Sequence, residues 1–177
     1  MPELPEVEYA RKVAETVARG QRIVDARVSE DPIVYEGVAP DRVRDALIDA
    51  KVTGTGRRGK HLWLALDRRP WLLMHFGMTG FLARPGRDAL MLSSTPAAGE
   101  PPIWPPRFSK LQLRFEDGGE LAVVNKRRLG RIRLRDDPER ESPVSELGFD
   151  PLLDPPTPDA FFAERLECFG PYQDAMV

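Results

Sequence analysis

Two residues at the start of the chain are the first candidates for chemistry. The sequence opens MPELPEVE, so a proline and a glutamate follow the initiating methionine. Methionine before proline is normally removed, and Pro2 would then carry a free secondary amine. Because an α-amino group has a pKa of roughly 7.7–8.0, part of it is neutral near pH 7 and can form a Schiff base with an electrophilic carbon. Glu3 can move protons beside it. The same residues also suit a plain helix start, which the stretch alone favours.

Three later stretches could bind an anion or a base stack. Lys60, in GRRGKHLWL over 56–64, enters an apolar strand where it can reach a phosphate or protonate a leaving group. Met78, in MHFGMTG over 74–80, sits at a loop tip and can act as an apolar wedge between bases. The turn NKRRLG over 125–130 suits phosphate contact and insertion into a duplex. Each has a plainer alternative, namely a solvated lysine, a core methionine and a solvated turn.

The elements that must position these residues follow from hydrophobic periodicity. Apolar residues at helical spacing predict a helix over 3–19 and a short one over 40–50. The stretch EDGGE at 116–120 predicts a hairpin turn. Strands are predicted over 22–29, 60–67, 71–76, 110–115, 120–125 and 131–135. The expected fold class is α+β, mainly β with flanking helices: an antiparallel β-sandwich or barrel with an N-terminal helix.

Composition narrows the classes of protein. With 177 residues, 41% hydrophobic and 31% charged, the chain has the composition of an ordinary globular domain. No apolar run is long enough for a bilayer, and no secretory signal is expected. Cys168 is the only cysteine, and His61 and His75 are the only histidines, so we expect no zinc site, no other metal and no cofactor. The expected location is intracellular, cytoplasmic if the source is bacterial and nuclear or organellar if it is eukaryotic.

The distribution of charge is more informative than the net charge of −2. Lys and Arg gather in 126–135 and 56–61, whereas acids gather at the N-terminus and in 136–167. The net charge argues mildly against a general polyanion binder, but clustered cations in a weakly acidic chain predict one positive face.

In their order along the chain, these stretches resemble the formamidopyrimidine-DNA glycosylases, also called Fpg or MutM. The motifs that carry the resemblance are PELPEVE at 2–8, RRGK at 57–60, HFGMTG at 75–80, NKRRLG at 125–130 and SELGFDPL at 145–152. Leu4 favours this branch over the endonuclease-eight branch, which usually begins PEGPE. Residues 104–134 look more like the plant and fungal type than the bacterial type.

The resemblance implies a base-excision-repair DNA glycosylase/AP lyase that acts on oxidised purines such as 8-oxoguanine. Pro2 would attack C1′ of the damaged nucleotide, and Glu3 would help to open the sugar. Glu6 would lie beneath the site on the helix, and Lys60 would contact phosphate and assist catalysis. The implied DNA-binding residues are Met78 and Arg127, which would fill the gap left by the flipped base, with Arg128, Leu129, Arg107 and Lys110. Leu129 departs from the family, which usually has Phe at this wedge position.

The expected organisation is a catalytic sandwich domain over 1–135, followed by a proline-rich linker and the truncated start of a helical DNA-binding domain over 136–177. The resemblance ends near residue 166, so we expect weak duplex binding by this chain and its best activity on abasic sites. The expected partner is damaged double-stranded DNA, without a membrane, and the expected state is a monomer. Two rival interpretations stay open, a non-catalytic damaged-DNA-binding fragment and an inert truncated product.

Overall fold

The computed structural model of the chain describes residues 2–86 and 103–160. It divides the chain into two compact units, Met1–Glu146 and Leu147–Val177, and the first holds every helix and strand named here. The elements in chain order are α1 (Leu4–Ala18), β1 (Ile23–Val28), α2 (Pro40–Leu47), β2 (Val52–Arg58), β3 (His61–Leu66), β4 (Trp71–His75), β5 (Phe81–Ala83), β6 (Ser109–Phe115), β7 (Glu120–Val124), β8 (Arg131–Arg135) and a short 3₁₀ helix, η1 (Val144–Glu146). The first unit therefore continues past the predicted boundary at residue 135.

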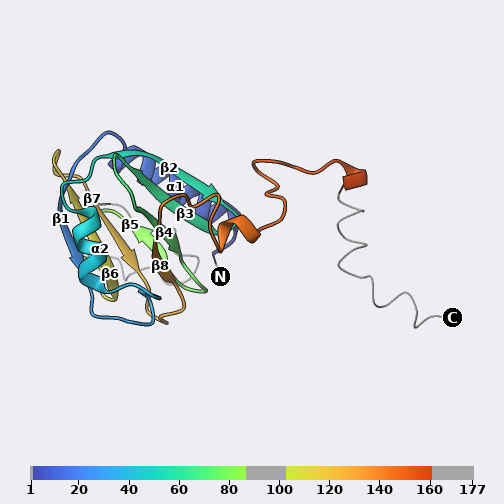
Figure 1. The fold of residues 1–177 in the computed structure, drawn as a ribbon. Helices are drawn as coiled ribbons and strands as arrows, with labels where there is room; N and C mark the ends of the chain where they lie inside the picture. Colours follow the sequence, from blue (N-terminus) through green and yellow to red (C-terminus); the bar gives the residue numbers. More distant parts are fainter. Residues whose placement is uncertain (1, 87–102, 161–177) are drawn as a thin grey trace. The chain divides into compact units, whose positions relative to one another are not determined.

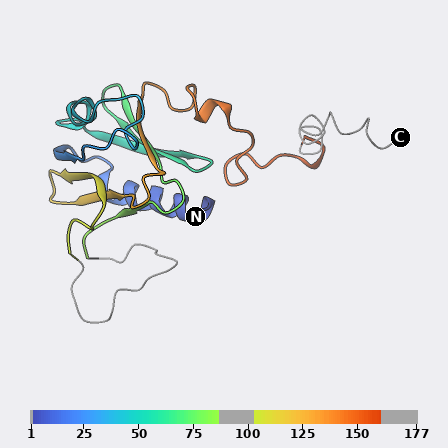
Figure 2. The same ribbon diagram turned by 90° about the horizontal axis from the view of Figure 1, so that it is seen from below.

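Eight strands form two four-stranded antiparallel sheets (Figures 1 and 2). The strand order is β1-β6-β7-β5 in one sheet and β2-β3-β4-β8 in the other. Helix α1 packs against β2, β3 and β7, and α2 packs against β1 and β4, so each helix touches both sheets. This confirms the predicted α+β sandwich with an N-terminal helix, and β6 and β7 form the predicted hairpin.

The core lies between the sheets, and its pattern of burial differs among the strands. Burial alternates along β6, whereas β3, β4 and β7 each have three or more consecutive buried residues. Buried side chains of β3 and β4 face those of β6 and β7, and each such side chain stabilises the fold by about 1.5–3 kcal/mol. Alternate residues of β8 divide between two faces: Ile132 is buried in the core, whereas Arg131 and Arg133 both reach Glu36. The stretch 126–135 is therefore not one continuous positive face, because part of its charge is neutralised on the outside of the second sheet.

Strand β2 was missed by the sequence prediction, because its two glycines lower strand propensity. Gly56 pairs with Trp63 of β3, and a Cβ atom on Gly56 would lie 2.2 Å from the Trp63 ring. The strand thus needs glycine at this position to make room for the indole. Strand β5 was also missed, since it has only three residues. The sequence also predicts a long proline-rich surface loop over 84–107 and a further helix over 158–166. Most of both segments, and Cys168, lie outside the described residues.

Candidate active site at one end of the sandwich

The strand register brings the predicted site loops to one end of the fold. In the second sheet His61 pairs with His75 and His75 with Arg131, so the start of β3, the end of β4 and the start of β8 lie side by side. In the first sheet Val124 pairs with Phe81 and with Ser109, which aligns the end of β7 with the starts of β5 and β6. Asn125 joins the two ends through a hydrogen bond from Nδ2 to the carbonyl of Phe76, at 2.9 Å.

The start of α1 brings the predicted catalytic residues together. Glu3 is the N-cap, and its backbone N–H donates to Oε2 of Glu6 at 2.9 Å, one half of a capping box. This bond fixes the peptide that joins Pro2 to Glu3. The Glu3 carboxylate lies 3.1 Å from Nζ of Lys60, with the side chains 57% and 33% exposed. A carboxylate and an ammonium are thus held next to Pro2, where they can exchange protons or hold an anion.

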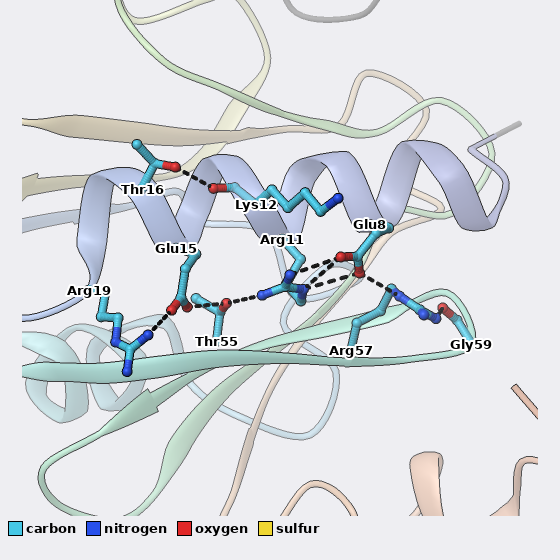
Figure 3. A network of polar contacts seen from close by, with 9 residues as sticks. All are labelled: Glu8, Arg11, Lys12, Glu15, Thr16, Arg19, Thr55, Arg57 and Gly59. Carbon is cyan, nitrogen blue, oxygen red and sulfur yellow. Dashed lines mark hydrogen bonds and ion pairs between the residues drawn. The ribbon is translucent and has the colours of Figure 1, made fainter. Parts of the chain in front are cut away.

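A buried arginine holds the β2–β3 turn against α1 (Figure 3). Arg57 is 4% exposed; its Nε donates to Glu8 at 3.0 Å, and its NH1 donates to the carbonyl of Gly59 at 3.1 Å. Because Gly59 directly precedes Lys60, this link sets the position of Lys60 relative to the start of α1. The expectation that Arg57 belongs to an exposed positive face was wrong, since burial beside Glu8 withdraws its charge from the surface.

Further polar contacts join α1 to β2 along the helix (Figure 3). Arg11 donates to Glu8 at 2.9 Å and to Oγ1 of Thr55 at 3.2 Å, and Thr55 in turn donates to Glu15 at 2.7 Å. Hydrogen bonding from Arg11 lowers the pKa of Glu8 despite partial burial, with a further contribution from Arg57. These contacts make α1 and β2 one rigid support for the end of the sandwich that carries Glu3 and Lys60.

Asn125 organises the loops that carry the predicted wedge residues. Its side chain is buried, and besides the bond to Phe76 its Oδ1 accepts from the backbone N–H of Leu129 at 3.1 Å. A Cβ atom on Gly130 would lie 2.1 Å from Nδ2 of Asn125, so this close approach requires glycine. The two loops leave Met78 44% exposed and Leu129 41% exposed, and Arg127 between them in sequence is exposed as well. All three are free to meet a ligand.

Two of the predicted DNA contacts are occupied within the protein. Asp31 is 3% exposed, and its carboxylate accepts from Lys110 Nζ at 2.7 Å and from Arg128 Nε at 3.0 Å. Burial opposes ionisation, but the hydrogen bonds from Arg128 and Lys110 outweigh it and hold the pKa of Asp31 well below its ordinary value. Asp31, Lys110 and Arg128, here called the Asp31 cluster, thus anchor the loop that carries Arg127. Direct DNA contact by Arg128 and Lys110 stays a prediction, as does contact by Arg107, which is exposed before β6.

The two histidines lie against each other at the same end. Their ring centroids are 4.8 Å apart, and the Nδ1 of His61 is buried with no hydrogen-bond partner in the part of the chain that the structure describes. Burial, then His75 and Arg133, lower the pKa of His61 to about 4. Burial and the nearby cations of Arg133, Lys60 and Arg131 also lower the pKa of His75. Both rings are therefore neutral at pH 7.

This pair predicts a loss of stability in mild acid. The unfolded chain protonates His61 as the pH falls through 6.5, whereas the folded chain stays neutral until about pH 4, so unfolding takes up a proton in this window. We expect the free energy of unfolding to fall by about 1–2 kcal/mol over that range, after allowance for solvent screening. Denaturant titrations at several pH values measure it. His61→Phe should flatten the slope; an equal slope in the variant would contradict the assignment.

Sequence reasoning missed the groups that position the site. Glu8 and Asn125 lie within the motifs PELPEVE and NKRRLG, but these motifs do not show that the two side chains hold distant segments. The contacts of Glu8 with Arg57 and of Asn125 with Phe76 each span 49 residues. Asp31 lies in no motif, and its partner Arg128 is 97 residues away. Within residues 2–86 and 103–160, no group of three His, Cys, Asp or Glu side chains is arranged to hold a metal ion. No helix in these ranges is long and apolar enough to span a bilayer.

Comparison with known families and proteins agrees with this architecture. Residues 1–132 match the family described as the formamidopyrimidine-DNA glycosylase N-terminal domain. The formamidopyrimidine-DNA glycosylase of Arabidopsis thaliana is 38% identical over 166 residues, which cover 94% of this chain and 42% of that protein. That of Mycolicibacterium smegmatis is 35% identical over 159 residues, 86% of this chain and 50% of that protein. The chain spans about half the length of these relatives, or slightly less.

Solved structures share the fold. The complex of Lactococcus lactis Fpg with DNA containing an abasic site superposes with a TM-score of 0.58 at 23% identity, over 75% of this chain and 43% of that one. MutM in complex with DNA containing carbocyclic 8-oxo-G gives a TM-score of 0.58 at 24% identity, with the same coverage. At this identity the likeness supports the fold alone. The family match and the identity to the curated relatives show that the chain belongs to the formamidopyrimidine-DNA glycosylase family and contains its N-terminal domain.

Proposed function

We propose that this domain is the catalytic part of a base-excision-repair DNA glycosylase and AP lyase that acts on oxidised purines. The observation that carries the proposal is the contact of Glu3 with Lys60 at 3.1 Å, directly beside Pro2 and at the end of the fold that carries Met78 and Arg127. The names of the relatives and the damaged DNA in the solved complexes support it.

In the proposed mechanism the amine of Pro2, free once Met1 is removed, attacks C1′ of the damaged nucleotide. A bond forms between nitrogen and C1′, while the bond from C1′ to the base breaks and its electron pair leaves with the base, which takes up a proton. Glu3 transfers the proton that opens the sugar ring and leaves an iminium. Loss of a proton from C2′ then expels the 3′ phosphate by β-elimination, and water releases the amine. Lys60 holds the neighbouring phosphate and neutralises charge on it.

Base extrusion fits the exposed wedge residues. Removing a base from the stack costs about a few kcal/mol, and a side chain that fills the vacated space offsets part of this cost. Met78 and Arg127 lie on loops that Asn125 holds rigidly, so little additional ordering is needed on binding.

The direct test is borohydride trapping with the 177-residue chain and duplex DNA containing an abasic site. Reduction of the Schiff base should give a covalent complex, and mass spectrometry should place the link on Pro2. Reversible binding without a crosslink would instead favour a damaged-DNA-binding fragment, and absence of both would favour an inert product.

Salt dependence of DNA binding tests the predicted phosphate contact. Each neutralised phosphate contributes a slope of about −0.9 to log K against log salt concentration for duplex DNA. We therefore expect Lys60→Met to reduce the magnitude of the slope by about 0.9, measured by fluorescence anisotropy at several salt concentrations. Arg133→Met is the matched control, because Arg133 is already paired with Glu36 on the outer face of the sheet. If Arg133→Met lowers the magnitude of the slope and Lys60→Met does not, the DNA binds near the outer face of the sheet and not at Lys60.

A further inference from the structure

Phe108, the residue before β6, combines exposure with an unusual backbone. Its side chain is 40% exposed and its φ is +67°. A bulky residue in the left-handed region is a true outlier, and such strain persists only where neighbouring contacts impose it, most often at functional positions. Neither feature is used by the mechanism proposed above.

Three hydrogen bonds impose this conformation. The backbone N–H and the hydroxyl of Ser109 both donate to the carbonyl of Pro106, at 3.2 and 2.6 Å, and close the turn around Phe108. The carbonyl of Phe108 accepts from the backbone N–H of Asn125 at 3.1 Å. Asn125 thus fixes a third loop, and Phe108 belongs to the same rigid assembly as the loops that carry Met78 and Leu129.

Two cations lie over the Phe108 ring. The guanidinium carbon of Arg107 is 4.8 Å from the ring centroid, and Nζ of Lys126 is 5.8 Å from it. An exposed ring flanked by cations is the arrangement with which proteins stack on a nucleobase while they hold the adjoining phosphates. Of the exposed apolar side chains that the structure describes close to these contacts of Asn125, namely Met78, Phe108 and Leu129, only Phe108 is aromatic.

We propose that Phe108 is the stacking residue of the DNA-binding end, where it packs on an unpaired nucleobase while Arg107 and Lys126 bind the flanking phosphates. This rests on the proposed function, because it requires DNA at this end of the fold. The role is one of binding: Phe108 stabilises DNA whose stacking the wedge residues have opened, and Leu129, which is aliphatic, cannot make this contact.

The test uses the full chain and a duplex with a tetrahydrofuran abasic-site analogue opposite 2-aminopurine. In the unaltered chain, stacking of Phe108 on 2-aminopurine should change the fluorescence of this base when the DNA binds. We expect Phe108→Leu to raise the Kd about tenfold and to abolish this fluorescence change. Phe108→Tyr should keep the Kd and the fluorescence change within about twofold of the unaltered chain. The salt slope should be unchanged in Phe108→Leu and smaller by about 0.9 in Arg107→Met, because only the second variant removes a charge. Tyr9→Leu is the matched control, an aromatic residue of α1 that is 39% exposed and should keep the Kd. Circular dichroism confirms that each variant is folded.

The outcomes separate this inference from the proposed function. The stacking role of Phe108 is overturned if Phe108→Leu has the same Kd and the same fluorescence change as the unaltered chain. It is also overturned if Phe108→Tyr binds the duplex as weakly as Phe108→Leu. If the unaltered chain shows the expected stacking pattern but gives no borohydride crosslink, the catalytic proposal fails and the stacking role stands. If the unaltered chain does not bind the duplex, both fail.

Discussion

Replacement of Pro2 by threonine should reduce borohydride trapping by roughly a thousandfold, because it replaces the nucleophilic secondary amine of proline by a hindered primary amine. Glycine at this position keeps an unhindered amine and should weaken trapping much less, whereas the branched side chain of threonine crowds the nitrogen. The yield of crosslinked abasic DNA over time measures both variants. Pro5→Thr is the matched control, since Pro5 also lies at the start of α1 but its nitrogen is part of an internal peptide bond.

The same chemistry makes an N-terminal extension informative. Residues left before Pro2 convert its amine into an amide, which has no nucleophilic lone pair, so a protein with a retained N-terminal tag should give no crosslink. Removal of the tag should restore trapping. Full crosslinking by the tagged protein would contradict the role of Pro2 as the nucleophile. Lys60, whose amine lies beside Glu3, would then be the candidate nucleophile.

Asp31→Asn should destabilise the fold by about 2–4 kcal/mol, because it leaves two cations beside a buried site without their counter-charge. Lys110 is only 14% exposed, whereas Arg128 is 47% exposed and can turn towards water. Arg128→Ala should therefore cost less, about 1 kcal/mol, since Lys110 still compensates Asp31. The free energy of unfolding from denaturant titration measures each variant.

Two controls define this prediction. Asp25→Asn, in a surface pair with Arg27, should change the stability by less than about 0.5 kcal/mol. The double variant Asp31→Asn with Lys110→Met should recover part of the loss, because no unpaired lysine remains. A loss below about 0.5 kcal/mol in Asp31→Asn would show that the cluster does not stabilise the loop that carries Arg127.

The Asp31 cluster also fixes the sign of a pH effect. The pKa of Asp31 is lower in the folded than in the unfolded chain, so its stabilisation is complete above the ordinary value of 3.8 and is lost as the pH falls through the folded value. This window lies below that of the histidine pair, so acid titrations of Asp31→Asn and His61→Phe separate the two contributions.

Local patterns in the sequence determined the type of fold and the identity of the candidate chemistry. Short runs of apolar and β-branched residues predicted six of the strands that the structure contains, because a buried strand requires only a local stretch of such residues. Apolar residues at helical spacing predicted α1, because a helix that packs on a core buries one face every three to four residues. The structure adds a capping box between Glu3 and Glu6 at its start. Short motifs singled out Pro2, Glu3 and Lys60 as candidates, because each is recognisable from its immediate neighbours.

The tertiary structure alone decided which charges are exposed and how the loops are held. Arg57 looks like a surface cation in RRGK, yet its partner Glu8 lies 49 residues away; Arg128 finds Asp31 at a separation of 97 residues. The glycines of β2 argue against a strand, yet Gly56 provides the space that the Trp63 ring of the next strand occupies. Burial, ion pairing and close approach depend on which segments meet in three dimensions, and no local window of sequence contains that information.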